Sequence, residues 1–395
     1  MGPVTDPGTP EHFVVNSTPV LCSGSSINLE QKQSGSIESK GCPQRVLGEA
    51  VTLHGKTQPS GEFIASRIES EAFERSRVDG TAVVERVEQH HGDSSHLILQ
   101  ADGYRIRMVA ETKRVYLDPL TRDTAITPNL WLRYSGVQEL DGTVTATNVT
   151  FSENILTTRQ AKMSNKQEFD PALVTEHDKQ GRLSKLVHGD DPQRLPAYTD
   201  ADMQQRVEAI GARLVPAYQR TLHPSESAKL NFRFQVVNYE KVKDAIAFSN
   251  GIILVPRQVV ERLENDSQLA TVLADNIACA MEKQTLRTIP IGDAMLAADF
   301  ASAAATIVFP ETVLIHWAGR KVTYSKLQQH EEEQSGRVSL SLLRDAGYDI
   351  TQAPVTWWLL ASKKPRNETT IPYRARYLYG QLATTWRGDL NLPAH

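Results

Sequence analysis

The spacing of apolar residues changes once along this chain, and that change limits which folds are open to it. From residue 45 to 151, apolar and polar residues alternate in short runs separated by glycine and Asp-Gly turns, a pattern typical of half-buried β-strands. From about residue 200, apolar residues recur at helical spacing. The 395 residues are enough for two or three domains. The sequence therefore predicts a multidomain protein, with a small all-β barrel (OB-like) followed by a mainly helical α+β domain.

Shifts in composition indicate the domain boundaries. Residues 1–44 are rich in glycine, serine, proline and threonine without sustained periodicity, and we expect them to be disordered. Residues 45–151 form the predicted barrel. Residues 152–199 are polar and are predicted to be a linker with some helix near 158–168. Residues 200–395 form the predicted α+β domain.

The barrel region contains an internal repeat. The segments "HGKTQPSGEFIASRIE" (54–69) and "SGVQELDGTVTATNVT" (135–150) superpose without a gap. The matched residues are Gly55 with Gly136, Gly61 with Gly142, and Ala65 with Ala146. Each copy predicts a hairpin whose turn closes on the second glycine. The region resembles small barrel modules of bacterial envelope proteins, which implies a structural or docking role.

The charge balance narrows the classes of partner. The formal net charge is -4 and the pI is about 6.3, so the chain has no excess of cations for binding phosphate. Aromatic and cationic residues of the barrel region do not cluster into a base-stacking platform. We therefore expect no nucleic-acid partner, and the sequence leaves the oligomeric state open.

The chain shows no apparent membrane span or export signal. No run approaches the roughly 18 to 20 continuous apolar residues of a membrane helix, and the first residues lack a basic stretch followed by an apolar one. We expect a soluble protein, cytoplasmic as the sequence stands, or periplasmic if its start omits a signal peptide. Three cysteines do not make a disulfide framework. We expect Cys22 and Cys42 to be free thiols, with pairing open in an oxidising compartment, and Cys279 to be a buried inert thiol.

The segment "LATVLADNIACAMEK" (269–283) is predicted to be a helix of the second domain. A helix at 202–222, a half-buried strand at 229–239 and a hairpin turning at Asn250-Gly251 precede it. Asp266 or Ser267 can serve as its N-cap. The predicted core stripe consists of Leu269, Val272, Leu273, Ile277 and Ala280.

This order of elements resembles the HtpX, BepA and CAAX-prenyl-endopeptidase family of zinc metallopeptidases over roughly residues 202–390. Three segments carry the resemblance: "DAIAFSNGIILVPRQVVERLENDSQLATVLA" (244–274), "ADNIACA" (274–280) where the family has "AHEIAHV", and "EEQSGRVSLSLLRDAGYD" (332–349) with its "AGYD" intact. The resemblance implies a zincin-type, gluzincin-like fold for the second domain.

The family's catalytic residues are largely replaced here. In the family, two histidines one helical turn apart and a later glutamate bind zinc, and a glutamate between the histidines deprotonates zinc-bound water. By position, the first histidine is Asp275, the general base is Asn276, the second histidine is Cys279 and the third ligand is Glu332. An amide has no ionisable group near neutral pH, so Asn276 cannot act as a general base.

The resemblance therefore implies a catalytically inactive homologue, a pseudopeptidase that uses no cofactor and has a polypeptide-binding, regulatory or scaffolding role. One alternative is an active zinc endopeptidase in which Asp275, Cys279 and Glu332 still bind zinc. Another is a β-barrel adaptor with a passive C-terminal domain.

A polypeptide is the expected partner. In the family, an edge strand beside the active cleft can pair with an extended polypeptide. The matching segment here is "GIILVPR" (251–257). We predict that the edge of a peptide groove is formed by Gly251, Ile252, Ile253, Leu254 and Val255.

Overall fold

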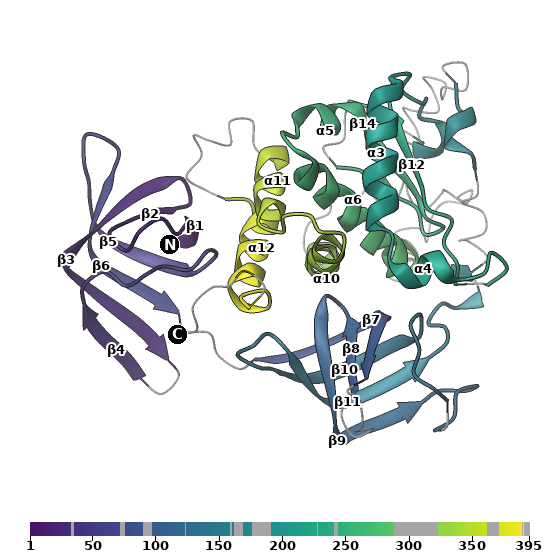
Figure 1. Cartoon of the computed structure of the whole chain (residues 1–395), viewed down its shortest axis with the longest axis horizontal. Helices are drawn as coiled ribbons and strands as arrows, with labels where there is room; N and C mark the ends of the chain where they lie inside the picture. Colours follow the sequence, from purple (N-terminus) through teal and green to yellow (C-terminus); the bar gives the residue numbers. More distant parts are fainter. Residues whose placement is uncertain are drawn as a thin grey trace, which may run out of the picture.

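The computed structural model describes residues 1–32, 35–71, 76–89, 97–122, 124–158, 160–161, 169–175, 191–226, 228–240, 244–287, 323–361, 371–388 and 390. They form two β-barrel-like sheets and a mainly helical α+β domain (Figure 1). The first barrel lies at the left of Figure 1, the second at the lower right, and the α+β domain at the upper right. In the described part of the chain, no helix is long and apolar enough to cross a membrane.

The first barrel is built from the N-terminal strands. They are β1 (Gly2–Asp6), β2 (His12–Val15), β3 (Thr18–Lys32), β4 (Gly35–Lys40), β5 (Ala50–Thr57) and β6 (Phe63–Glu71). Five of them pair in the order β1-β2-β3-β6-β5, and β5 pairs back with β1, so the ring is closed. The remaining strand, β4, pairs with β3 outside the ring.

The second barrel follows directly and repeats this order. Its strands are β7 (Arg77–Gln89), β8 (Leu97–Ala101), β9 (Tyr104–Tyr116), β10 (Trp131–Gln138) and β11 (Val144–Ser152). They close in the order β7-β8-β9-β11-β10, which is the order of the first ring strand for strand. Both rings have five strands, the number found in OB-fold barrels.

The internal repeat occupies the same place in both barrels. In each copy a glycine pairs across the hairpin with the repeat's alanine, directly after a bulge. Left-handed backbone positions also match: Gly48 with Asn129 (φ 84° and 79°), Gly61 with Gly142 (87° and 80°), and Asn16 with Asp102 (51° and 55°). We predicted one barrel over residues 45–151. The structure corrects this, because the repeat marks two copies of a whole barrel.

Within residues 1–44, the described ranges contain the four strands β1 to β4, contrary to the expectation of disorder. Val4, Phe13 and Val20 are buried in the core of the first barrel. Cys22 and Cys42 form a disulfide that ties β3 to the segment after β4, so they are not the free thiols that we expected. The strands β1 and β2 are short and are separated by polar turns, so their alternation is too brief to stand out in the sequence.

The segment predicted as a linker packs against the α+β domain where the structure describes it. It contains two short 3₁₀ helices, η1 (Pro171–Leu173) and η3 (Pro192–Arg194). The side chain of Gln160 donates from Nε2 to the main-chain oxygen of Leu286 at 2.8 Å. Most of the helix predicted near 158–168 falls on residues outside the described ranges.

The third part of the molecule combines helices with a small sheet. Its elements are α3 (Ala201–Leu214), α4 (Ala217–Thr221), β12 (Arg233–Val237), β13 (Ile246–Ala247), β14 (Ile252–Pro256), α5 (Arg257–Arg262), α6 (Asp266–Met281), α7 (Gln284–Arg287), α10 (Thr323–Asp345), α11 (Gln352–Ala361) and α12 (Tyr373–Thr384). The helix predicted at 202–222 is split in two, because Pro216 lacks an N–H and disfavours helical backbone before it.

Helix α6 is the centre of the α+β domain. The helices α3, α10 and α11 all pack against it. It is buried almost all round rather than along the single stripe that we predicted. Its N-cap is Asn265, whose side chain accepts from the backbone N–H of Gln268 at 3.0 Å. The cap therefore lies one residue before the two candidates named from the sequence.

The small sheet has the order β12-β14-β13, so β14 is its central strand. All five residues of β14 are buried. The predicted groove edge from Gly251 to Val255 is therefore wrong, because backbone groups paired on both sides of a strand cannot accept a further one. A continuous apolar run is typical of a strand buried on both faces, and "IILV" is such a run. The edges of this sheet are β12 and β13.

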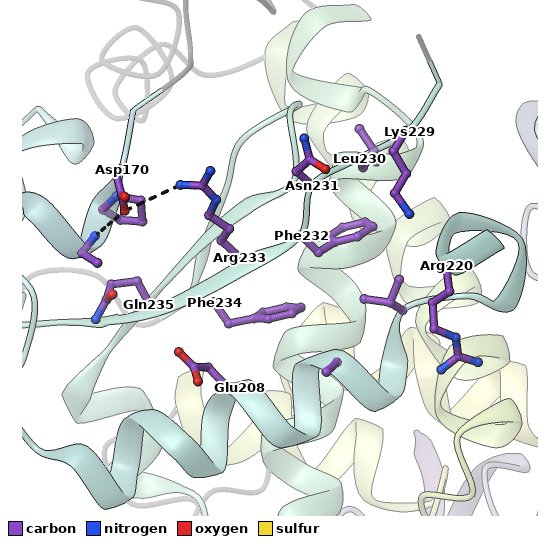
Figure 2. Close-up of a pocket in the computed structure, with 14 residues that line it drawn as sticks. Asp170, Glu208, Arg220, Lys229, Leu230, Asn231, Phe232, Arg233, Phe234 and Gln235 are labelled. Carbon is purple, nitrogen blue, oxygen red and sulfur yellow. Dashed lines mark hydrogen bonds and ion pairs between the residues drawn. The ribbon is translucent and has the colours of Figure 1, made fainter. Parts of the chain in front are cut away.

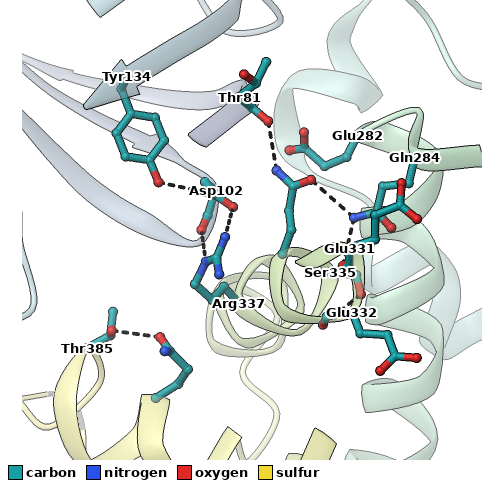
Figure 3. Close-up of polar contacts among 12 residues, drawn as sticks. Thr81, Asp102, Tyr134, Glu282, Gln284, Glu331, Glu332, Ser335, Arg337 and Thr385 are labelled. Atoms are coloured by element: carbon teal, nitrogen blue, oxygen red, sulfur yellow. Dashed lines mark hydrogen bonds and ion pairs between the residues drawn. The ribbon is translucent and has the colours of Figure 1, made fainter. Parts of the chain in front are cut away.

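The second barrel docks on α10 through buried polar contacts (Figure 3). The guanidinium of Arg337 donates to Asp102 Oδ1 at 2.7 Å and to its main-chain oxygen at 3.1 Å. The side chains of this pair are only 7% and 1% exposed. Tyr134 OH donates to Asp102 Oδ2 at 2.7 Å, so both carboxylate oxygens are bonded. This clamp fixes the barrel on the helix that carries Glu332.

The first barrel contacts the other side of the α+β domain through β1 and α12. Gly48 packs directly against the main-chain oxygen of Tyr379, leaving no room for a Cβ atom. Figure 1 shows α11 and α12 standing between this barrel and the rest of the helices. The first barrel is thus attached at α12, whereas the second is attached at α10 and also meets Thr385, at the end of α12, through Gln138 and Gly142.

Candidate functional site

Helix α6 carries the three positions that the sequence analysis placed at the centre of the site. Asp275 and Cys279 lie one turn apart on the same face, and Asn276 follows Asp275. Asp275 and Asn276 are 2% and 4% exposed, and Cys279 is half-buried. A buried carboxylate needs a partner, because an unpaired charge in a protein interior is strongly unfavourable.

The partner of Asp275 is Arg374, near the start of α12. Its Nη2 atom forms an ion pair with Asp275 Oδ2, and its Nη1 atom lies 2.9 Å from Asp244 Oδ2. The same guanidinium lies over the ring of Trp357, with 3.2 Å from Cζ to the ring centroid. One cation from α12 therefore joins the middle of α6 to the segment before β13, with an aromatic ring of α11 against its face.

Three carboxylates act on the guanidinium of Arg374. Burial lowers the pKa of Arg374, but the carboxylates of Asp275, Asp244 and Glu332 raise it further than burial lowers it, so the guanidinium stays charged. Burial raises the pKa of Asp275, and Arg374 opposes that shift. The positive charge of Arg374 thus offsets part of the free-energy cost of burying the neighbouring carboxylates.

The side chain of Asn276 is held by hydrogen bonds. Its Nδ2 atom donates to the main-chain oxygen of Val272 at 2.9 Å and to Asp244 Oδ1 at 3.4 Å. An amide bonded in this way has a fixed orientation, and it does not ionise near neutral pH. At this position the geometry offers a hydrogen-bond donor and no base.

Cys279 faces Asp275 rather than an open site. Its Sγ atom donates to Asp275 Oδ2 at 3.9 Å, which requires a protonated thiol. Burial raises the pKa of the Cys279 thiol well above its usual value, and the charge of Asp275 adds to the effect. The thiolate, which is the form that binds metals, is therefore disfavoured here.

Glu332 lies on α10 and is half-buried. Its negative charge contributes to the raised pKa of Arg374, so it belongs to the same electrostatic cluster as Asp275 and Asp244. The structure thus brings the four sequence-predicted positions to the surroundings of one guanidinium. Within the described ranges, no group of three His, Cys, Asp or Glu side chains is arranged to hold a metal ion.

The sequence pattern does not indicate that Arg374, Asp244 and Trp357 belong to this cluster. Asp244 stands at a position where the resembled family has asparagine, and Arg374 is a cation before a Tyr- and Leu-rich helix, which were the available signals. Neither signal shows that residues 130 positions apart meet. Only packing of α12 and α11 on α6 brings them together.

Comparison with known proteins supports a metallopeptidase-like relationship over part of this chain. No protein-family model matches the chain. The chain is 27% identical over 173 residues to the beta-barrel assembly-enhancing proteases of Escherichia coli strain K12 and Shigella flexneri, and equally to that of Escherichia coli O157:H7. Each match covers 40% of this chain and 33% of the relative. The chain thus matches about a third of the length of these relatives.

Proposed function

We propose that this chain is a catalytically inactive homologue of zinc metallopeptidases, with a zincin-type second domain that binds polypeptide. The proposal rests on one observation above all: the guanidinium of Arg374 pairs with Asp275 and Asp244 beside Cys279 and Glu332. In the resembled family those positions surround a zinc ion. Here a side chain of the protein provides the positive charge.

The residues present do not fit a zinc ion. Asp275 is already neutralised by Arg374, and its Oδ2 atom also accepts from the thiol of Cys279. Zinc would have to displace the guanidinium and deprotonate the half-buried thiol of Cys279, whose pKa is raised, and both steps weaken metal binding. We therefore propose that the site holds no metal and that its charges stabilise the fold.

Hydrolysis would also lack a general base. Loss of such a group commonly slows an enzyme by about a hundred- to ten-thousand-fold, and Asn276 is held as a hydrogen-bond donor. The names of these relatives describe proteases that enhance β-barrel assembly. For this chain we propose that contact with polypeptide is retained and cleavage is lost, with the two barrels as a scaffold for the helical domain.

The disulfide bears on the compartment. Structural disulfides form in oxidising environments such as the bacterial periplasm, and they are rare in the cytosol. The bond between Cys22 and Cys42 ties the β3 strand of the N-terminal barrel to the segment after β4. We therefore propose an oxidising, extracytoplasmic compartment, which is one of the two alternatives that the sequence leaves open.

The test compares metal content and proteolysis. Purified wild-type protein and a Glu332→Ala variant are analysed by mass spectrometry for bound metal, and both are assayed against casein with and without o-phenanthroline. We expect less than a tenth of a zinc ion per chain and no chelator-sensitive cleavage. Stoichiometric zinc with cleavage that is lost in Glu332→Ala would overturn the proposal in favour of an active enzyme with atypical ligands.

A further inference from the structure

A groove runs along one edge of the small sheet, away from the Arg374 cluster. It lies between α3, the strand β12 with the loop before it, and residues 170–172, and its volume is about 710 Å³ (Figure 2). Ligand sites in proteins typically have volumes of about 300 to 1,000 Å³. The strand β12 is an edge of its sheet, so one side of it is available to the groove.

The backbone of β12 presents polar groups to this groove. Arg233 N donates to Gly251 O, so the backbone groups of Arg233 face β14. Backbone groups alternate along a parallel strand, so those of Phe232 and Phe234 face the other way. Phe234 O accepts from Gln204 Nε2 at 2.7 Å on that side, in agreement with this parity.

The chain itself pairs a short extended segment with this edge. At the C-terminal end of β12, Ala197 pairs antiparallel with Val237. Tyr198 N donates to Val236 O at 2.8 Å, next to the point where Val236 N donates to Gln204 Oε1. The C-terminal half of the edge is thus occupied by residues 196–198 and the amide of Gln204, and the N-terminal half lies on the groove.

The lining of the groove indicates the chemistry of its occupant. Leu230, Phe232 and Phe234 contribute apolar surface, and the two phenylalanine rings are stacked with centroids 6.3 Å apart. At one end, Figure 2 shows the side chains of Arg220 and Lys229. An extended polypeptide with apolar side chains and a carboxylate complements an edge strand, an apolar floor and a cationic end.

Among the lining residues that the structure describes, the opposite end of the groove carries no comparable excess of positive charge. There Arg233 forms an ion pair with Asp170, with 3.6 Å between Nη1 and Oδ1. Glu208 lies along α3 and accepts from Gln204 Nε2 at 2.7 Å. The electrostatic asymmetry therefore gives a bound peptide a preferred direction, with its carboxylate toward Arg220 and Lys229.

We propose that this groove binds an extended polypeptide as an additional strand on β12, with an apolar side chain over Phe232 and Phe234 and a terminal or side-chain carboxylate at Arg220 and Lys229. This inference rests on the proposed polypeptide-binding function and gives it a location. The location is neither the predicted β14 segment nor the Arg374 cluster.

The experiment uses the full chain and a defined probe. The probe is a fluorescein-labelled octapeptide of alternating valine and serine that ends in phenylalanine with a free carboxylate, and a second probe carries a terminal amide instead. Fluorescence anisotropy gives the affinity, and amide hydrogen exchange reports on the strand. We expect wild-type protein to bind the free carboxylate several-fold more tightly than the amide, and we expect protection of the Phe232 and Phe234 amides.

Two matched substitutions on α3 test the location. Ala212 is exposed and lines the groove, so Ala212→Trp should fill it and weaken binding at least tenfold. Ala209 is exposed on the same helix and is not among the lining residues, so Ala209→Trp should bind as the wild type does. Arg220→Gln should remove the preference for the free carboxylate while leaving binding of the amide peptide unchanged.

The outcomes separate this inference from the function on which it rests. Tight binding that Ala212→Trp leaves unchanged, without protection of Phe232 and Phe234, would overturn the groove and leave polypeptide binding in place. Failure to bind either peptide, together with failure to bind reduced and carboxymethylated α-lactalbumin, would overturn both. Equal affinity of wild type and Arg220→Gln for the free carboxylate would overturn the assigned direction.

Discussion

The two barrels have the same strand order and the same left-handed turns, but they are stabilised and attached in different ways. The first has the smaller apolar core and a disulfide, and it meets α12 through close backbone packing at Gly48. The second has a larger core without a disulfide, and it holds α10 through the buried pair of Asp102 and Arg337.

The comparison shows that two barrels of the same topology can be attached to a neighbouring domain in different ways. The turn between the second and third strands of each barrel makes the difference. In the first barrel this turn carries Asn16, an uncharged residue. In the second it carries Asp102, at the same backbone conformation, and Asp102 bonds Arg337 and Tyr134. A single change from amide to carboxylate thus distinguishes a neutral turn from one that binds a cation of the neighbouring domain.

Removal of Arg337 should have the largest effect on this comparison. Arg337→Ala leaves the charge of Asp102 buried without its partner, so we expect a loss of about 3 to 5 kcal/mol of unfolding free energy. Arg105→Ala is the control, because Arg105 pairs with Glu88 at 3.2 Å on the surface of the same barrel and should cost less than about 1 kcal/mol. Denaturant unfolding measures both. Equal losses would contradict a special role for the clamp.

Glu85 should make the interface of the second barrel sensitive to pH. Burial, with Asp345 and Asp102 nearby, raises the pKa of Glu85 from 4.5 to about 8. The folded protein therefore keeps a proton that the unfolded chain releases, so stability should fall as the pH rises from about 4.5 to about 8 and then level off. Glu85→Gln should be more stable than wild type at pH 8, by up to about 4 kcal/mol, and should match it at pH 4. Thermal melts across this range measure the slope, and a slope unchanged in the variant would assign it to other groups.

The disulfide should matter to the first barrel alone. The bond joins two cysteines that are 20 positions apart in the sequence. Loss of such a bond typically lowers the free energy of unfolding by about 2 to 4 kcal/mol. In the double variant Cys22→Ser, Cys42→Ser we expect faster amide exchange in β1 to β6 and unchanged exchange in β7 to β11. Cys279→Ser, outside both barrels, is the control. Loss of protection in both barrels would show that they unfold together.

The two repeated glycines should give the smallest effect and the most direct comparison. A Cβ on Gly142 would lie 2.4 Å from the main-chain oxygen of Thr385, whereas a Cβ on Gly61 would meet nothing within 4 Å. Both glycines have positive φ, so each alanine variant should lose about 1 kcal/mol to backbone strain. Gly142→Ala should lose a further 1 to 2 kcal/mol, roughly, by overpacking. Equal melting temperatures for the two variants would mean that Thr385, at the end of α12, shifts to accommodate the added Cβ at little cost in stability.

The strands of the barrels could be predicted closely from the sequence, because alternation and glycine turns are local signals. The hairpins predicted for the repeats at 54–69 and 135–150 correspond to β5-β6 and β10-β11, and the hairpin at Asn250-Gly251 is confirmed. The prediction of disorder over residues 1–44 was wrong. Val4 and Phe13 lie in separate short strands, and so they give no periodic signal in the sequence. The groove edge at β14 was also wrong, because a strand's place in a sheet depends on its neighbours.

The amino-acid sequence alone determined which side chains stand at the catalytic positions of the resembled family. It places an amide, Asn276, where a general base is required. The tertiary structure decided what surrounds them. It brought Arg374 from α12 onto Asp275 and Asp244, and it paired the turn of the second barrel with α10. The physical reason is that residue chemistry and hydrogen-bond periodicity act within a few residues, whereas burial of charge depends on segments that meet only after the chain has packed.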